Sequence, residues 1–152
     1  MMKWMLLAHL LGVTVWVGGM FFAYMTLRPA TVELLETPER LMLWNGVLRR
    51  FLSWVWVAVI LILTSGLGMI FRLGGFVGVP WTIHLMMAFG IAMMLIFAHV
   101  YFAAYQRLKR YVVAREWPAA GKALIQIRML IGMNLILGLL IIVVATLGSM
   151  HY

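Results

Sequence analysis

Four long runs of the chain carry no charged residue, and this pattern limits the possible folds more than any other feature of the sequence. The runs are residues 4–27, 51–71, 73–106 and 129–152. Each run supplies the ~20 apolar residues needed to cross ~30 Å of hydrocarbon, where backbone groups find no water and must bond within a helix. We therefore predict an all-α fold, an integral membrane bundle of four transmembrane helices.

The composition agrees with a single membrane domain. Of the 152 residues, 66% are hydrophobic and only 11% are charged, which is far from the usual soluble range. We expect one domain over residues 1–152, with a retained first helix and helices at about 4–27, 51–71, 81–106 and 122–148. Pro29 should end the first helix, because proline cannot continue the hydrogen-bond ladder. Thr37 and Pro38 should open a short amphipathic helix that merges with the second.

Positive charge is concentrated in two segments. Ten of the 12 lysines and arginines lie in residues 28–50 and 107–128, whereas Lys3 and Arg72 lie elsewhere. By the positive-inside rule both segments should be cytoplasmic, and the two termini and the loop between the second and third helices should be outside. We interpret the net charge of +8 as a basic rim that orients the protein and attracts anionic lipid. We expect the lipid bilayer as a partner and no nucleic acid.

All four histidines lie inside the charge-free runs, and an intramembrane histidine is a candidate functional residue. His9 and His84 both fall within about two helical turns of the outer boundary. His99 lies about 22 Å deeper than His84, so these two cannot share a metal ion. We expect His151, in the terminal segment, to lie near the same outer boundary as His9 and His84. Their similar depths therefore favour His9 and His84 as a pair of ligands to one metal centre.

Small residues share the helix faces of these histidines. The residues at helical spacing are Gly12, Trp16 and Gly19 with His9, and Ala88 and His99 with His84. If both faces point inward, they leave a slot for a flat macrocycle beside its axial ligands. The alternative is that small residues only let membrane helices approach and that the histidines are packing residues.

Missing residue types restrict the chemistry. The absence of cysteine excludes disulfides and thiolate-held iron–sulfur clusters, and the absence of aspartate, with the four glutamates in loops, excludes a carboxylate proton relay within the membrane. The 14 methionines are common apolar filler but also supply thioethers, which together with imidazole bind copper(I). Met20, Met87 and Met94 are the candidates near the histidines. Two kinds of chemistry are left for the protein, which are redox reactions of a bound cofactor and the passage of a soft metal ion.

The first and third helices resemble two related families. The stretch from His9 to Phe22, HLLGVTVWVGGMFF, followed by Leu27-Arg28-Pro29, is similar to the first helix of the CopD-like family of bacterial inner-membrane proteins, which is associated with copper resistance and uptake. The four-helix layout and the Trp81-Thr-Ile-His84 motif followed by His99 are also similar to HemJ-type protoporphyrinogen oxidases, which bind b-type haem. The second resemblance implies that His9 and His99 match family histidines, whereas His84 stands near a family lysine.

Taken together, these features favour an inner-membrane protein that binds haem b through His9 and His84 and transfers electrons, linked to a quinone. A copper transport protein of the CopD type and a HemJ-like protoporphyrinogen IX oxidase are the alternatives, so whether the protein is an enzyme stays open. His99, with Arg128 at similar depth, is a candidate site for a quinone, a porphyrin propionate or a second metal centre. The alternative is that His99 only packs within the bundle. The oligomeric state is also undecided, and a homo-oligomer is one possibility.

Overall fold

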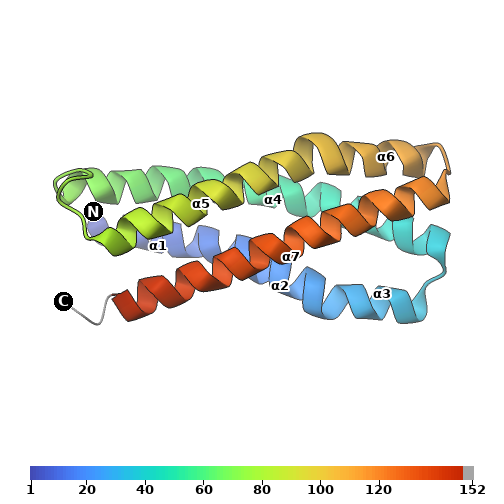
Figure 1. The fold of residues 1–152 in the computed structure, drawn as a ribbon, viewed down its shortest axis with the longest axis horizontal. Helices are drawn as coiled ribbons and strands as arrows, with labels where there is room; N and C mark the ends of the chain where they lie inside the picture. Colours follow the sequence, from blue (N-terminus) through green and yellow to red (C-terminus); the bar gives the residue numbers. More distant parts are fainter. Residues whose placement is uncertain (149–152) are drawn as a thin grey trace.

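The computed structural model describes residues 1–148 and consists of long helices that run back and forth along one axis (Figure 1). Within this part of the chain, four helices are long and apolar enough to cross a membrane. The predicted all-α class and the four membrane-spanning helices are confirmed. The protein is therefore a multi-pass membrane protein whose surroundings are a lipid bilayer.

The first of the four helices contains two wider, π-helical turns, and the third contains one. The first is made of α1 (Met2–Val13), a π-helical turn (Thr14–Gly18), α2 (Gly19–Phe22), a second π-helical turn (Ala23–Leu27) and α3 (Arg28–Leu34). The second is α4 (Thr37–Arg72). The third comprises α5 (Trp81–His99), a π-helical turn (Val100–Ala104) and α6 (Tyr105–Val113), and the fourth is α7 (Trp117–Gly148).

Pro29 does not end the first helix, contrary to our expectation. The helix continues to Leu34, and the chain becomes extended only at Leu35, with φ −123° and ψ 138°. A proline within a helix lacks one donor, and its ring collides with the carbonyl group four residues earlier. Here a π-helical turn, Ala23–Leu27, comes immediately before α3, and such a wider turn relieves that collision.

The other helices extend beyond the charge-free runs. The predicted merger of the amphipathic segment with the second helix is confirmed, because α4 runs without interruption from Thr37 to Arg72. The fourth helix begins at Trp117, five residues before Lys122, where we expected it to start. A charge-free run marks only the part of a helix suited to hydrocarbon, whereas the helix itself continues into its charged ends.

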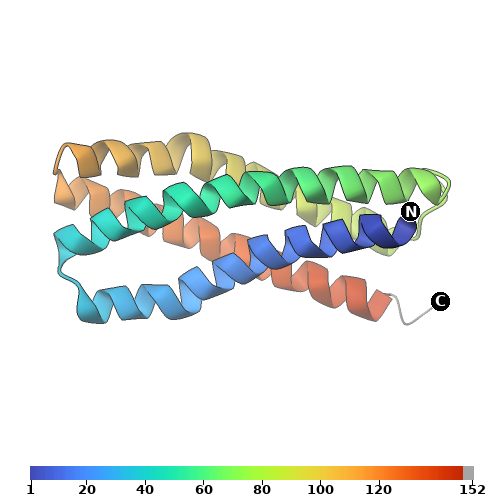
Figure 2. The ribbon, with the colours of Figure 1, turned by 180° about the vertical axis from the view of Figure 1, so that it is seen from behind.

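The helices pack in pairs, and the packing differs between the two ends of the bundle. The main contacts join α1 to α4, α5 to α7, and α6 to α7. Figure 2 shows α1 lying along α4, with the N-terminus and the end of α7 at the same end as the loop between α4 and α5. At the opposite end the core is closed by fully buried side chains, among them Leu41, Leu48 and Leu108.

Candidate metal site between the helix pairs

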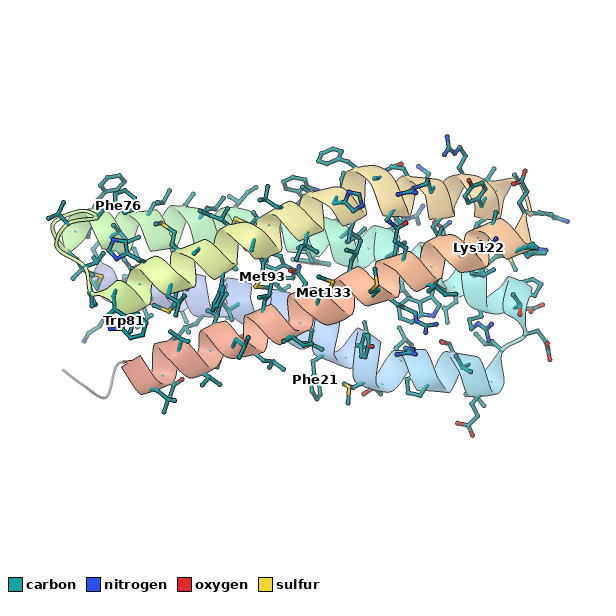
Figure 3. The ribbon with its side chains drawn as sticks, in the orientation of Figure 1. Phe21, Phe76, Trp81, Met93, Lys122 and Met133 are labelled. Atoms are coloured by element: carbon teal, nitrogen blue, oxygen red, sulfur yellow. The ribbon has the colours of Figure 1, made fainter. Side chains whose placement is uncertain are left out.

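An apolar cavity of about 260 Å³ lies in the half of the bundle that contains the N-terminus and the end of α7. Its walls come from all four long helices, with His9 and Trp16 on the first, Gly66 on α4, Met93 on α5 and Gly138 on α7. Figure 3 places Met93 about midway along the bundle, between Trp81 at one end and Lys122 near the other. The cavity therefore occupies membrane depth and lacks a charged side chain in its lining.

His9 is held in one orientation by α4. Its Nδ1 atom lies 3.2 Å from the Ile62 carbonyl oxygen and 3.2 Å from Ser65 Oγ. A carbonyl oxygen can only accept, so the hydrogen bond to Ile62 places a proton on Nδ1. The Ser65 hydroxyl donates its own hydrogen to the Leu61 carbonyl group, which leaves its oxygen free to accept from His9. In the neutral imidazole, Nε2 then keeps its lone pair, which is the usual arrangement of a metal-binding histidine.

Five methionines contribute to the wall of the cavity. The methionines that line the cavity are Met69, Met86, Met87, Met93 and Met94. From helical angle alone, neighbours such as Met86 and Met87 point in quite different directions. Both nevertheless line the cavity, because it borders a wide arc of α5. Imidazole and thioether are both ligands of copper(I), so the lining can provide a soft, uncharged donor set.

His84 and His99 lie on a different surface from His9. Both are exposed and share one face of α5 with Ala88 and with Leu95, which is 67% exposed. The Nδ1 atom of His84 lies 3.3 Å from the Pro80 carbonyl oxygen at the start of the same helix. The expected inward orientation of this face is wrong, and neither histidine lines the cavity with His9.

The physical reason is that α5 is apolar on every side. Helical spacing shows which residues share a face, but polarity tells which face is inward only where the outside is water. In α5 the inward residues are Met93 and Phe97, which are 3% and 4% exposed. The structure thus does not bring His9 and His84 together, and their role as an axial pair stays a prediction.

The small residues of the first helix pack against α4. A Cβ atom added to Gly12 would lie 2.8 Å from an Ile62 side-chain carbon and 3.0 Å from the Ala58 carbonyl oxygen. A Cβ atom added to Gly19 would overlap the ring of Phe51. Both contacts agree with the packing alternative for these glycines. Trp16, by contrast, lines the cavity and is only 3% exposed.

The deeper group of candidate residues is only partly assembled. Arg128 and Tyr24 line the same small space near the opposite end of the bundle, whereas the exposed His99 is absent from that lining. His151 lies outside the described residues. Among residues 1–148, no three histidine or carboxylate side chains gather in a group that could hold a metal ion.

Ser65 and Gly66 are the site residues that the sequence did not single out. They form the part of α4 that supports His9, as the hydrogen bond to Ser65 and the closeness of Gly66 to the imidazole both show. The available signal was a serine followed by a glycine within an apolar run, seven and six residues before Arg72. That signal is weak, because both residue types are common in membrane helices.

Comparison with known proteins relates this chain to one protein family. A family model described as copper resistance protein D matches residues 45–147. The matched segment includes Ser65, Gly66 and the cavity methionines, and it begins after His9. No curated protein and no solved structure matches the chain.

Proposed function

The chain belongs to the copper resistance protein D family, and on that basis we propose that it binds copper(I) within the membrane, in the cavity between its helix pairs. The observation that carries this proposal is the orientation of His9. Its Nδ1 atom is occupied by the hydrogen bonds to Ile62 and Ser65, so Nε2 is the free donor of a residue that lines the cavity. Metal-binding histidines usually make such a second hydrogen bond, which fixes the tautomer.

The other donors suit a soft monovalent ion. The thioethers on α5 and Met69 on α4 can complete a coordination sphere with His9, and these ligands carry no charge. A site of this kind favours copper(I) over hard divalent ions, which prefer oxygen ligands. It also lies outside the class of histidine and carboxylate clusters, so the absence of such a cluster among residues 1–148 does not conflict with it.

The arrangement of the methionines also supports movement of the ion along the helix. Met86 and Met87 precede Met93 and Met94 by seven residues, which is about 10 Å along the helix axis. Two sets of thioethers at successive depths offer a copper ion successive ligands. We place the protein in the bacterial inner membrane with residues 28–50 and 107–128 on the cytoplasmic side, so that the cavity lies in the outer half.

Competition for copper(I) with a chromogenic chelator, under anaerobic conditions and in detergent, tests the proposal. We expect His9→Ala to weaken binding by at least about tenfold, in line with the loss of a metal ligand or of its support. His84→Ala removes an imidazole from the exposed face of α5 instead. This variant should bind copper(I) within about twofold of the wild-type affinity, because His84 supplies no ligand to the cavity. Wild-type affinity in His9→Ala would refute the assignment.

A b-type haem is the second candidate, because an apolar cavity with an oriented imidazole is also suited to hold the edge of a macrocycle. Electron transfer linked to a quinone, or oxidation of protoporphyrinogen IX, would then be the activity. Binding of haem by His9 and His84 together would require a different orientation of α5. Binding by His9 and a methionine thioether would not require that change. The visible spectrum of the purified protein distinguishes the candidates, since only bound haem gives a Soret band.

A further inference from the structure

A second group of polar side chains lies at the opposite end of the bundle from the cavity. Arg28 on α3 and Arg128 on α7 line one small space of about 10 Å³. The charge of Arg40, in the first turn of α4, also acts on Arg128 unfavourably, as does that of Arg28. All three arginines are half-buried, so their guanidinium groups remain reachable from outside. Arg28 and Arg128 therefore line one space between α3 and α7, and the positive charge of Arg40 on α4 lies near enough to act on Arg128.

The protein itself does not neutralise this group. The Nε atom of Arg128 is buried and has no hydrogen-bond partner. Among residues 1–148, the only hydrogen-bond partner of the Arg40 side chain is a neutral group, the Thr37 hydroxyl at 3.4 Å. Within residues 1–148 no glutamate forms an ion pair with any of the three arginines. Leaving a buried charged donor without an acceptor is costly, and holding like charges together adds to that cost.

Neighbouring side chains nevertheless hold Arg28 in place. Its guanidinium group lies over the Tyr24 ring, 5.1 Å from the ring centre. The same ring packs on α7, where a Cβ atom added to Gly132 would lie 3.1 Å from it. The Thr31 hydroxyl donates to the Arg28 carbonyl oxygen at 2.9 Å, and the buried indole of Trp44 donates to Thr31 at 3.2 Å. The Arg28 guanidinium group thus lies over a ring that packs on α7 at Gly132, one helical turn beyond Arg128.

We propose that Arg28 and Arg128, with Arg40 nearby, form a binding site for a phosphate group at this end of the bundle. Guanidinium groups bind phosphate oxygens through paired, charge-assisted hydrogen bonds, and one phosphate can satisfy several of them at once. The space between the side chains is too small to enclose a phosphate, so the group lies at the mouth, where the arginines reach the membrane interface. Its carrier is either a lipid headgroup or free inorganic phosphate.

Lipid retention in native mass spectrometry tests the site with a defined probe. The intact protein is exchanged into detergent containing phosphatidylcholine and phosphatidylglycerol, and the bound phosphatidylglycerol is counted. We expect Arg128→Gln to lower its retention about tenfold, because a charged hydrogen-bond donor is lost. Arg128→Lys keeps the charge without the paired geometry, and the expected loss is smaller. Arg110→Gln removes the same charge from an exposed position of α6 and serves as the matched control.

Inorganic phosphate is the second probe, and it separates the two carriers. Thermal unfolding is followed in micelles of a detergent without phosphate, with millimolar inorganic phosphate or with chloride at equal ionic strength. Stabilisation of wild type but not of Arg128→Gln identifies free phosphate, whereas selective loss of phosphatidylglycerol alone identifies the lipid headgroup. If Arg128→Gln and Arg110→Gln behave alike with both probes, the proposal is overturned. Should Arg128→Gln fail to fold, Arg28→Gln provides the same comparison.

Discussion

The imidazole of His9 lies directly against Gly66, where an added Cβ atom would come within 3.3 Å of His9 Cε1 and 3.4 Å of Nδ1. The carbonyl group of Ile62 and the hydroxyl of Ser65, both within one turn of that glycine, accept from the same imidazole. A single stretch of α4 therefore provides both the space and the hydrogen bonds that orient the candidate ligand. This relationship makes the site testable without changing His9 itself.

Replacing Gly66 by alanine should weaken copper(I) binding. The new methyl group is closer to the imidazole than most real contacts allow, so the ring must shift by a few tenths of an ångström and Nε2 moves with it. We expect an affinity loss of up to about tenfold in the chelator competition. Gly90→Ala is the control, because Gly90 also lines the cavity but an added Cβ atom there meets no atom within 4 Å. Equal affinities of the two variants would contradict this account of the site.

Removing the Ser65 hydroxyl should have a related but smaller effect. Ser65→Ala deletes one of the two acceptors of His9 Nδ1, whereas the Ile62 carbonyl group remains and still favours the same tautomer. We expect copper(I) affinity to fall about threefold, which is less than the roughly tenfold or greater effect of losing all support of a ligand. Ser53→Ala is matched to it, because Ser53 lies on the same helix, is exposed and donates only to the Arg49 carbonyl group. A larger loss in Ser53→Ala than in Ser65→Ala would argue against this role.

The sequence predicted the number and kind of helices because a lipid environment demands them. Backbone groups in hydrocarbon must bond within a helix, so a long charge-free run leaves few alternatives. The ends were harder to locate, as Pro29 shows. Whether a proline ends a helix or is accommodated by a π-helical turn depends on how the neighbouring helices pack, and the local sequence does not contain that information.

The candidate site was predictable only in part, and the two outer histidines show why. His9 could be placed near a small-residue face, and the structure puts it in the lining of a cavity. His84 met the same criteria but is exposed, because an apolar helix surrounded by lipid gives no contrast between its inward and outward faces. The supporting contacts of Ser65 and Gly66 depend on the register between α1 and α4, which only the packed structure defines.

The close approach of α1 to α4 predicts a clear stability difference between two glycines of the first helix. In Gly12→Ala the added methyl group meets the Ala58 carbonyl oxygen at 3.0 Å, and the backbone of α4 cannot yield as a flexible side chain would. We expect the free energy of unfolding, measured by titration with a denaturing detergent, to fall by about 1–3 kcal/mol. Gly18→Ala should be neutral or slightly stabilising, since its added Cβ atom meets no atom within 4 Å and alanine is the better helix former. A stable Gly12→Ala protein that loses only cofactor or metal binding would instead favour a binding role for this glycine.

The orientation of the chain in the membrane decides from which side a metal ion reaches the cavity. The loop 73–80, the N-terminus and the end of α7 lie at the end of the bundle nearest the cavity (Figure 2). The segments 28–50 and 107–128, which hold most lysines and arginines, lie toward the other end. The positive-inside rule then predicts that a reporter active only outside the cytoplasm works when inserted after Gly75 or fused to the C-terminus, and fails when inserted after Glu116. A cytosolic reporter at the same three positions should give the opposite pattern and controls for expression. If the reporters place Gly75 in the cytoplasm, the cavity would face inward, and copper(I) would enter it from the cytoplasm rather than from outside.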